Sequence, residues 1–497
     1  MQALSIGLAA SALSAASCVA RTSRCCSMSA VPGLLAEATA QLAERGVELR
    51  LGSTATPGSR TSSRIAVRAG PDGAAMVGMF KAGTHEVVPC EADERCYLPH
   101  HPLINDAVAA VAGELRASAE LSAYDESSLR GTLRYLQLSV ERSSDTVQLT
   151  LVANAPSLAA DPALAQFALR LWRLRAPRWH SIWVNLNPTS VNNILSYEPD
   201  AWQLLHARDP RGLGGGGGDG DRDAGRDGCL VERFPSGAAF VLPPWVFRQA
   251  NLYAFDAIVG ALRRAVPAGS RVVEWYAGVG VLGLSLAPSV AWVRCSDLNP
   301  PYAAFEASRD LLPKGERARV TYAVGGAAER LDDARGADVA VVDPPRKGLD
   351  DALLAALCDA RADGPCASLG TLAYISCGFP ALVRDADALL ASGWRVRRQR
   401  AEAHVLFLGA NHLETLCVFE REAPVGPDGA KQDAQEPPRS SANSIQIPLY
   451  GRRRTARLAL GLDTNAVCVW VEALAAQNVL LKQQIEALRQ MLCDASM

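Results

Sequence analysis

The sequence lacks the features of a membrane-spanning or nucleic-acid-coating protein. No stretch reaches 18 uninterrupted apolar residues, the length from which a transmembrane helix is predicted. The formal net charge is only −2, from 50 basic and 52 acidic residues, whereas a protein that coats nucleic acid is usually far more basic. We therefore expect no membrane contact, and any contact with RNA must depend on local basic patches.

Regular cysteine spacing is also missing. The 13 cysteines are scattered and odd in number, which favours an intracellular chain with reduced thiols over a secreted disulfide framework. Apolar residues make up 49% and charged residues 21% of the 497 residues, as in soluble globular proteins. This composition excludes a wholly disordered chain and a collagen-like fibre, and the length suggests about three units, or two with tails.

Acidic residues are absent from the first 36 positions, and Glu37 is the first one. Many Ser and Ala residues together with Arg21 and Arg24 are typical of a transit peptide. A secretory signal is the alternative, because residues 6–20 are mildly apolar, but serines interrupt this stretch and a charged start is missing. We predict a transit peptide over residues 1–30 and a chloroplast location, with the mitochondrion as the alternative.

The front half, residues 33–211, alternates predicted helices and strands without a catalytic signature. Apolar periodicity predicts helices over 33–48, 100–116 and 161–174. Alternating residues predict strand pairs within 63–88 and 132–154. We interpret this half as a smaller α/β domain on the substrate side of the molecule.

A possible RNA contact lies near the end of the third predicted helix. Its residues alternate arginine and tryptophan: Arg170, Trp172, Arg173, Arg175, Arg178 and Trp179. This mixture suits phosphate contacts and base stacking, although an ordinary amphipathic helix has the same pattern. Residues 212–228, rich in Gly and Asp, are expected to be a flexible insertion, and residues 423–445 a linker.

From Ser270 the pattern changes to strand, Gly-rich turn, helix, strand and acidic residue. One strand leads into Gly278-Val279-Gly280, and the next ends at Asp297, 19 residues beyond Gly278. Glycines allow a ligand close to a helix N-terminus. An acid at this spacing can bind the ribose hydroxyls of a nucleoside cofactor. The GVG turn by itself leaves a nicotinamide-binding unit open.

Two later strands end in groups that can take part in chemistry. The strand in DVAVVDPPRKGL (338–349) ends in Asp343-Pro344-Pro345, a rigid elbow against which a flat base can lie. A turn that only ends the strand is the alternative. LAYISCGF (372–379) places Cys377 just beyond the next strand. Its thiol could face the same crevice as a nucleophile, although a lone cysteine there is more often buried and inert.

Five segments in series resemble the RNA uracil-5-methyltransferase family: FRQAN (247–251), EWYAGVG (274–280), DPPRKGL (343–349), YISCG (374–378) and NHLET (411–415). The front-half segments RIAVRA, GMFKAGTHEVV and HHPLIN are similar to its plant and cyanobacterial branch. The resemblance implies a doubly wound, Rossmann-like class I methyltransferase domain over 235–422. It also implies S-adenosyl-L-methionine as methyl donor and 5-methyluridine in tRNA or rRNA as product. The smaller α/β domain over 33–211 is then the RNA-binding domain.

The resemblance also assigns residues. A thiolate from Cys377 adds to C6 of uracil and makes C5 electron-rich, and Glu414 then removes the C5 proton. Four residues match the donor-binding positions: Gln249, Tyr276, Asp297 and Asp343. Asp297 would hold ribose, and the others would enclose the rest of the donor and face the base.

Some positions depart from the family pattern. Asn-Pro usually follows the cysteine, but here Gly378-Phe379 does, and FLGANHLE lacks the usual proline and threonine. Many bacterial members bind an iron–sulfur cluster, and Cys96 fits one ligand position, but no cysteine trio precedes it, so we expect no metal or cluster. Methylation of another base or a smaller substrate is the alternative activity. A silent RNA-binding factor is the other alternative, but it would need neither Cys377 nor Glu414.

The tail, outside the resemblance, has apolar residues at spacings of four and three over residues 464–494. The seam consists of Val467, Val471, Leu474, Asn478, Leu481, Ile485, Leu488 and Leu492. Such a heptad seam with Asn at a core position favours a parallel pair of helices. It predicts a short coiled coil and a homodimer, unless the stripe docks on the chain's own surface.

Overall fold

The computed structural model describes residues 30–421, with gaps at 71–72, 82, 91–96, 119, 190–192, 199, 209–226, 300, 360 and 409–411. The predicted transit peptide, the linker and the heptad helix lie outside these residues, as does most of the 212–228 insertion. Within the described part, no helix combines the length and apolarity needed to cross a bilayer.

The larger of two main sheets has eight strands in the order β1-β16-β17-β15-β14-β11-β12-β13. Its parallel centre consists of β11 (Arg271–Trp275), β12 (Trp292–Asp297), β13 (Val320–Val324), β14 (Val339–Val342) and β15 (Thr371–Ser376). β17 (Glu414–Glu420) runs antiparallel between β15 and β16 (Arg395–His404). The predicted doubly wound α/β domain is confirmed.

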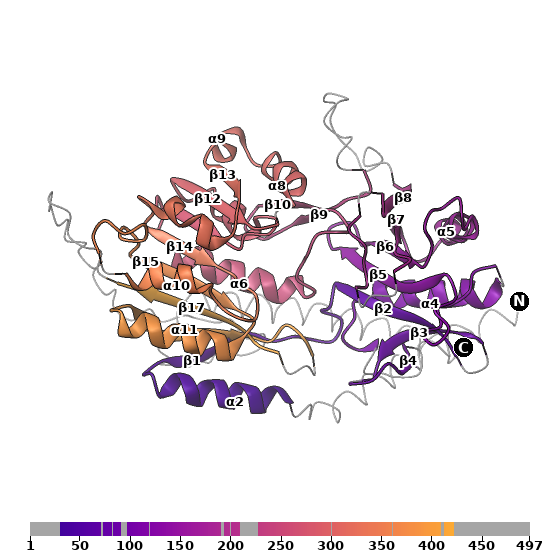
Figure 1. Cartoon of the computed structure of the whole chain (residues 1–497), viewed down its shortest axis with the longest axis horizontal. Coiled ribbons are helices and arrows are strands. Elements are labelled where there is room, and N and C mark those ends of the chain that lie inside the picture. Colours follow the sequence, from indigo (N-terminus) through magenta and orange to yellow (C-terminus); the bar gives the residue numbers. More distant parts are fainter. Residues whose placement is uncertain are drawn as a thin grey trace, which may run out of the picture. The chain divides into compact units, whose positions relative to one another are not determined.

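Helices cover both faces of this sheet (Figure 1). In β14, Val339 and Val341 pack in one core cluster, and Ala340 and Val342 pack in the other. The first cluster includes α6 (Leu252–Ala265), α7 (Val281–Leu286) and α8 (Tyr302–Arg309). The second includes α2 (Ala30–Ala43), α10 (Asp351–Cys358) and α11 (Phe379–Ala391). Burial on both faces explains why the central strands are continuous apolar runs.

The N-terminal segment was predicted to belong to the front domain, but in the structure it belongs to the larger sheet. The helix expected over 33–48 ends at Ala43, and β1 (Glu48–Ser53) follows and pairs in parallel with β16. α2 lies beside α11 (Figure 1), where Arg45 donates to Asp387 at 2.6 Å. Helical periodicity shows which face of a segment is buried but not which sheet covers it, so the boundary at residue 33 was wrong.

The smaller sheet has seven strands in the order β4-β3-β2-β5-β6-β7-β8. Its strands are β2 (Ser62–Ala69), β3 (Ala75–Phe80), β4 (Val87–Pro89), β5 (Leu133–Glu141), β6 (Thr146–Ala153), β7 (Trp179–Leu186) and β8 (Trp202–Ala207). Both predicted strand pairs, β2–β3 and β5–β6, are antiparallel neighbours. α4 (Pro102–Ala117) and α5 (Ala163–Arg173) share its core, and β9 (Leu230–Arg233) pairs with β10 (Ala239–Leu242) separately.

The arginine–tryptophan segment is not the open stacking surface that its composition suggested. Trp179 is 1% exposed, and its indole N–H donates to a backbone carbonyl of α5. Trp172 stacks on His206 with ring centroids 5.5 Å apart, and Arg170 lies 3.1 Å from Glu120. The stacking role predicted for Trp179 is wrong, because the indole is buried in the core of the smaller sheet.

The described cysteines are mostly reduced. Cys229, Cys295, Cys358, Cys366, Cys377 and Cys417 are free thiols. Cys90 is disulfide-bonded, so the expectation of reduced thiols throughout is wrong at this residue. Cys96 lies outside the described residues. Among those described, no three His, Cys, Asp or Glu side chains form a group that could hold a metal ion.

Candidate active site

Strand pairing brings Cys377 and Glu414 together. Antiparallel β15 and β17 pair Ser376 with Thr415. Cys377 follows Ser376 directly, and Glu414 precedes Thr415, so one further step of the same register sets thiol and carboxylate side by side. Opposed side chains of paired strands lie about 5 Å apart at Cβ. Two residues 37 positions apart in the chain thus become neighbours at the carboxyl end of β15.

The surroundings of Cys377 disfavour its thiolate. Burial, together with the negative charges of Glu414 and Asp343, raises the pKa of the Cys377 thiol to about 11, and the Arg346 guanidinium opposes this shift. Burial also raises the pKa of Asp343 well above its ordinary value, aided by Glu414 and Glu274. Because these groups affect one another so strongly, the three acidic side chains Cys377, Glu414 and Asp343 form one cluster.

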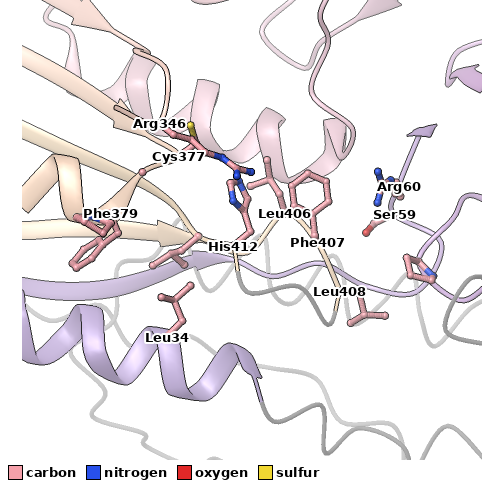
Figure 2. Close-up of a pocket in the computed structure, with 14 residues that line it drawn as sticks. Leu34, Ser59, Arg60, Arg346, Cys377, Phe379, Leu406, Phe407, Leu408 and His412 are labelled. Atoms are coloured by element: carbon pink, nitrogen blue, oxygen red, sulfur yellow. The ribbon is translucent and has the colours of Figure 1, made fainter. Parts of the chain in front are cut away.

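A pocket of about 620 Å³ opens at this cluster and has Cys377 in its wall. Figure 2 shows Arg346 and His412 next to Cys377, with Phe407 and Arg60 further along the pocket. The Arg60 guanidinium lies 5.3 Å from the centre of the Phe407 ring. The volume is in the range of small-molecule sites. An apolar wall with cations suits a flat ring that carries a phosphate.

Sequence reasoning missed three of these pocket residues. Arg346 and His412 stand inside the quoted segments DPPRKGL and NHLET, so the motifs themselves carried the signal. Arg60 had no such signal, since it precedes β2 in the front half and meets Phe407 only through the tertiary fold.

The glycine at position 378 is explained by steric exclusion. A Cβ atom built at this position would overlap the backbone carbonyl of Arg346. The loop after β14 therefore passes directly over the residue that follows Cys377. The departure from Asn-Pro brings the Asp-Pro-Pro-Arg elbow close to the thiol.

The Gly-rich turn after β11 forms an open cradle. Gly278 and Gly280 have φ values of +54° and +76°, which L side chains rarely adopt. A Cβ built on Gly278 would meet nothing within 4 Å. Asp297, at the end of β12, accepts the Gly278 N–H at 3.0 Å and the Asn299 N–H at 3.0 Å. Open backbone beside a fixed carboxylate fits a ribose-bearing cofactor.

Two other predicted donor-site residues are held differently. The Tyr276 hydroxyl donates to the Asp350 carboxylate at 3.0 Å and accepts the Asp350 N–H at 3.1 Å, so only its ring remains for a donor. Gln249 is half-buried in the loop before α6 and hydrogen-bonds to no residue in the described ranges. Nearby Asn251 caps α6 and donates to the Leu406 carbonyl of the pocket wall at 2.9 Å.

Glu274 is a buried acid that sequence reasoning quoted without giving it a role. It lies in β11, where it accepts the Gly283 N–H at 2.9 Å and the Cys295 thiol at 3.1 Å. Burial raises its pKa to about 7. Gly283 is required beside it, since a Cβ there would overlap the carboxylate. Its position as the first residue of EWYAGVG was the available signal.

Comparison with known proteins identifies the family, although no family model matches the chain. A protein of Protochlamydia amoebophila named as an uncharacterized RNA methyltransferase is 32% identical over 368 residues, 73% of this chain and 86% of that protein. The chain belongs to the RNA methyltransferase family. A 23S rRNA (uracil(1939)-C(5))-methyltransferase of Chromohalobacter salexigens is 35% identical to this RNA methyltransferase over 167 residues, 33% of each chain.

A solved structure agrees with this fold. The Pyrococcus abyssi tRNA (uracil-54, C5)-methyltransferase, in complex with S-adenosyl-L-homocysteine, superimposes with a TM-score of 0.55 at 18% identity. The match covers 78% of this chain and 83% of that one. The family resemblance predicted from the five segments is confirmed, and the placement in a plant or cyanobacterial branch stays a prediction.

Proposed function

We propose that this RNA methyltransferase acts on C5 of uridine in tRNA or rRNA and forms a covalent bond between Cys377 and C6 of the base. The observation that carries the proposal is the pairing of β15 with β17, which sets the pocket-lining Cys377 beside the buried Glu414. A nucleophile and a base at adjacent positions are the two groups that this reaction needs. A protein that only binds RNA needs neither.

Each side chain has a separate task. Cys377 adds to C6 as a thiolate, and the electron pair of the C5=C6 bond makes C5 a nucleophile. Once C5 is methylated, Glu414 removes its proton, the C5=C6 bond forms again and the sulfur leaves. Arg346 lowers the pKa of the thiol and so favours the attacking form. The target uridine must be flipped out of its stack to reach this pocket.

S-adenosyl-L-methionine is the methyl donor in the proposal, and it supplies an electrophilic methyl group when bound. Asp297 would hold its ribose, beside the open turn at Gly278. The ring of Tyr276 and the side chains of Gln249 and Asp343 would enclose the remainder and face the base. The S-adenosyl-L-homocysteine in the Pyrococcus abyssi structure supports this donor.

The test is Cys377→Ala. We expect loss of methylation on unmodified tRNA and rRNA transcripts and loss of any denaturation-resistant protein–RNA complex, with donor affinity by calorimetry retained. Cys358→Ala is the matched control, since Cys358 is also a half-buried free thiol but lies in α10 outside the pocket. Normal turnover by Cys377→Ala would overturn the covalent mechanism. Methylated nucleosides other than 5-methyluridine in the product digest would overturn the choice of base.

We also propose that residues 1–30 direct the chain to the chloroplast. The support is their lack of acidic residues and their Ser and Ala content. A fluorescent protein fused behind residues 1–36 should enter chloroplasts. Mitochondrial or cytosolic fluorescence would contradict the proposal.

A further inference from the structure

The Glu414 carboxylate is held at one oxygen only. It is 3% exposed, and its Oε1 atom lies 3.1 Å from Nε2 of His412. Its Oε2 atom is buried and has no hydrogen-bond partner in the described part of the chain. An unpartnered buried oxygen is costly, which points to a substrate atom as its partner during the reaction.

His412 is itself fixed by the pocket wall. Its ring centroid lies 5.2 Å from that of Phe407, tilted by 53°. Figure 2 shows the imidazole between Phe407 and Cys377, and both of these residues also line the pocket. Because an ionised carboxylate can only accept, Nε2 is the ring nitrogen that carries the proton. The His412 N–H therefore donates a charge-assisted hydrogen bond to Oε1 of Glu414.

We infer that His412 is a positioning residue for Glu414. Its N–H binds Oε1, so the carboxylate plane is fixed and Oε2 faces the proton on C5. This inference rests on the proposed function, and it assigns His412 to a single step, the release of the methylated product.

The step is balanced without any further reactant. Oε2 takes the proton from C5, and the electron pair of that C–H bond forms the C5=C6 bond. The C6–S bond breaks, and the sulfur of Cys377 leaves with its electron pair as a thiolate. His412 keeps its proton throughout, so its contribution is geometric and electrostatic.

Measuring the two steps of the reaction separately distinguishes a positioning role of His412 from simple packing. Methyl transfer depends on Cys377 and the donor, whereas product release depends on Glu414. If His412 only packs against Phe407, its loss should impair both steps together. If it positions Glu414, release should slow much more than methyl transfer.

The experiment uses the full chain with unmodified tRNA and rRNA transcripts that carry tritium at C5 of uridine. Single-turnover methyl incorporation measures transfer, and tritium released to water measures elimination. In His412→Leu we expect elimination to slow by about 10- to 100-fold, since a hydrogen bond to a charged group is lost. A methylated, denaturation-resistant complex should accumulate, while transfer changes by only a few-fold. His412→Gln, whose amide N–H can reach Oε1, should restore most of the release rate.

His85→Leu is the matched control, because His85 also contacts a glutamate, at 2.9 Å, but does so outside the pocket. It should behave as wild type. Wild-type release by His412→Leu, or equal slowing of both steps, would overturn the positioning role while the proposed function stands. If Cys377→Ala still methylates RNA, the proposed function fails and the role of His412 fails with it.

Discussion

Cys377 lies beside two carboxyl groups that oppose its ionisation. Its thiol has a pKa of about 11, raised by burial first and then by Glu414 and Asp343. The thiol is therefore held mainly in its protonated form, which is less nucleophilic than the thiolate. The proposed mechanism therefore requires that the pKa of Cys377 falls when RNA and donor bind.

Glu414→Gln should lower the pKa of Cys377, because it removes one of the negative charges that raise it. We expect alkylation of Cys377 by iodoacetamide at pH 8, followed by mass spectrometry, to become several-fold faster. Glu402→Gln is the control, since Glu402 lies on β16 and does not act on the thiol. Equal rates in all three proteins would mean that Glu414 does not act on the sulfur.

At the scale of a structural element, the turn between β11 and α7 is stabilised by a buried acid, Glu274. Glu274 accepts the Gly283 N–H from the first turns of α7 and the Cys295 thiol from β12. These bonds hold the Gly-rich cradle against two adjacent strands. Their cost is a carboxyl group inside the core, with a pKa raised to about 7.

A raised carboxyl pKa makes stability depend on pH. The contribution of protonated Glu274 to the free energy of unfolding is fully present below its unfolded-state pKa of 4.5. It is lost as the pH rises through the folded-state pKa of about 7. Glu274→Gln should therefore be more stable than wild type at pH 8, by up to about 3 kcal/mol, with little difference at pH 4.5. Urea unfolding at both pH values measures this. Exposed Glu198→Gln should show neither effect, and equal pH profiles for wild type and Glu274→Gln would contradict the prediction.

On the scale of the whole molecule, a buried ion network joins the smaller sheet to the segments before and within α6. Arg142, in the turn after β5, donates to Glu232 of β9 at 3.0 Å and to Asp256 of α6 at 2.6 Å. Arg248 donates to the other Glu232 oxygen at 3.3 Å. Glu232 is fully buried, and among the described residues its ion-pair partners are these two arginines.

Glu232→Gln should destabilise the protein by about 3 kcal/mol or more, because two arginines lose their buried counter-charge. Urea unfolding at neutral pH checks this value. Glu120→Gln breaks an ion pair of the same kind at a 63% exposed side chain, and it should cost less than about 1 kcal/mol. Similar losses in both variants would show that burial does not decide the strength of the network.

The heptad tail gives a prediction for the assembly of the whole chain. In the predicted heptad seam of residues 464–494, Asn478 falls at a core position, and such a seam favours a parallel pair of helices. The full chain should sediment as a dimer at micromolar concentration, and a chain ending at Glu422 as a monomer with unchanged methylation. A monomeric full-length protein would contradict the coiled coil.

Much of the fold follows from local pattern. The strands ending at Asp297, Asp343 and Cys377 were predictable because a buried parallel strand is a short apolar run with a functional group at its carboxyl end. The hairpin β5–β6 was predictable from alternation around a polar turn. The fate of α2 and the burial of Trp179 were not, because periodicity shows that a face is covered but not by which element.

The sequence by itself determined that this chain carries a class I methyltransferase domain and that Cys377 and Glu414 belong to it. A motif is defined by residue types and their spacing along the chain, and the sequence contains both. Only the tertiary structure decided that the two residues are neighbours, that His412 holds one oxygen of Glu414, and that Arg60 reaches the pocket from the front half. These contacts join residues whose distance depends on strand register and on packing between elements. Neither register nor packing can be predicted from local sequence.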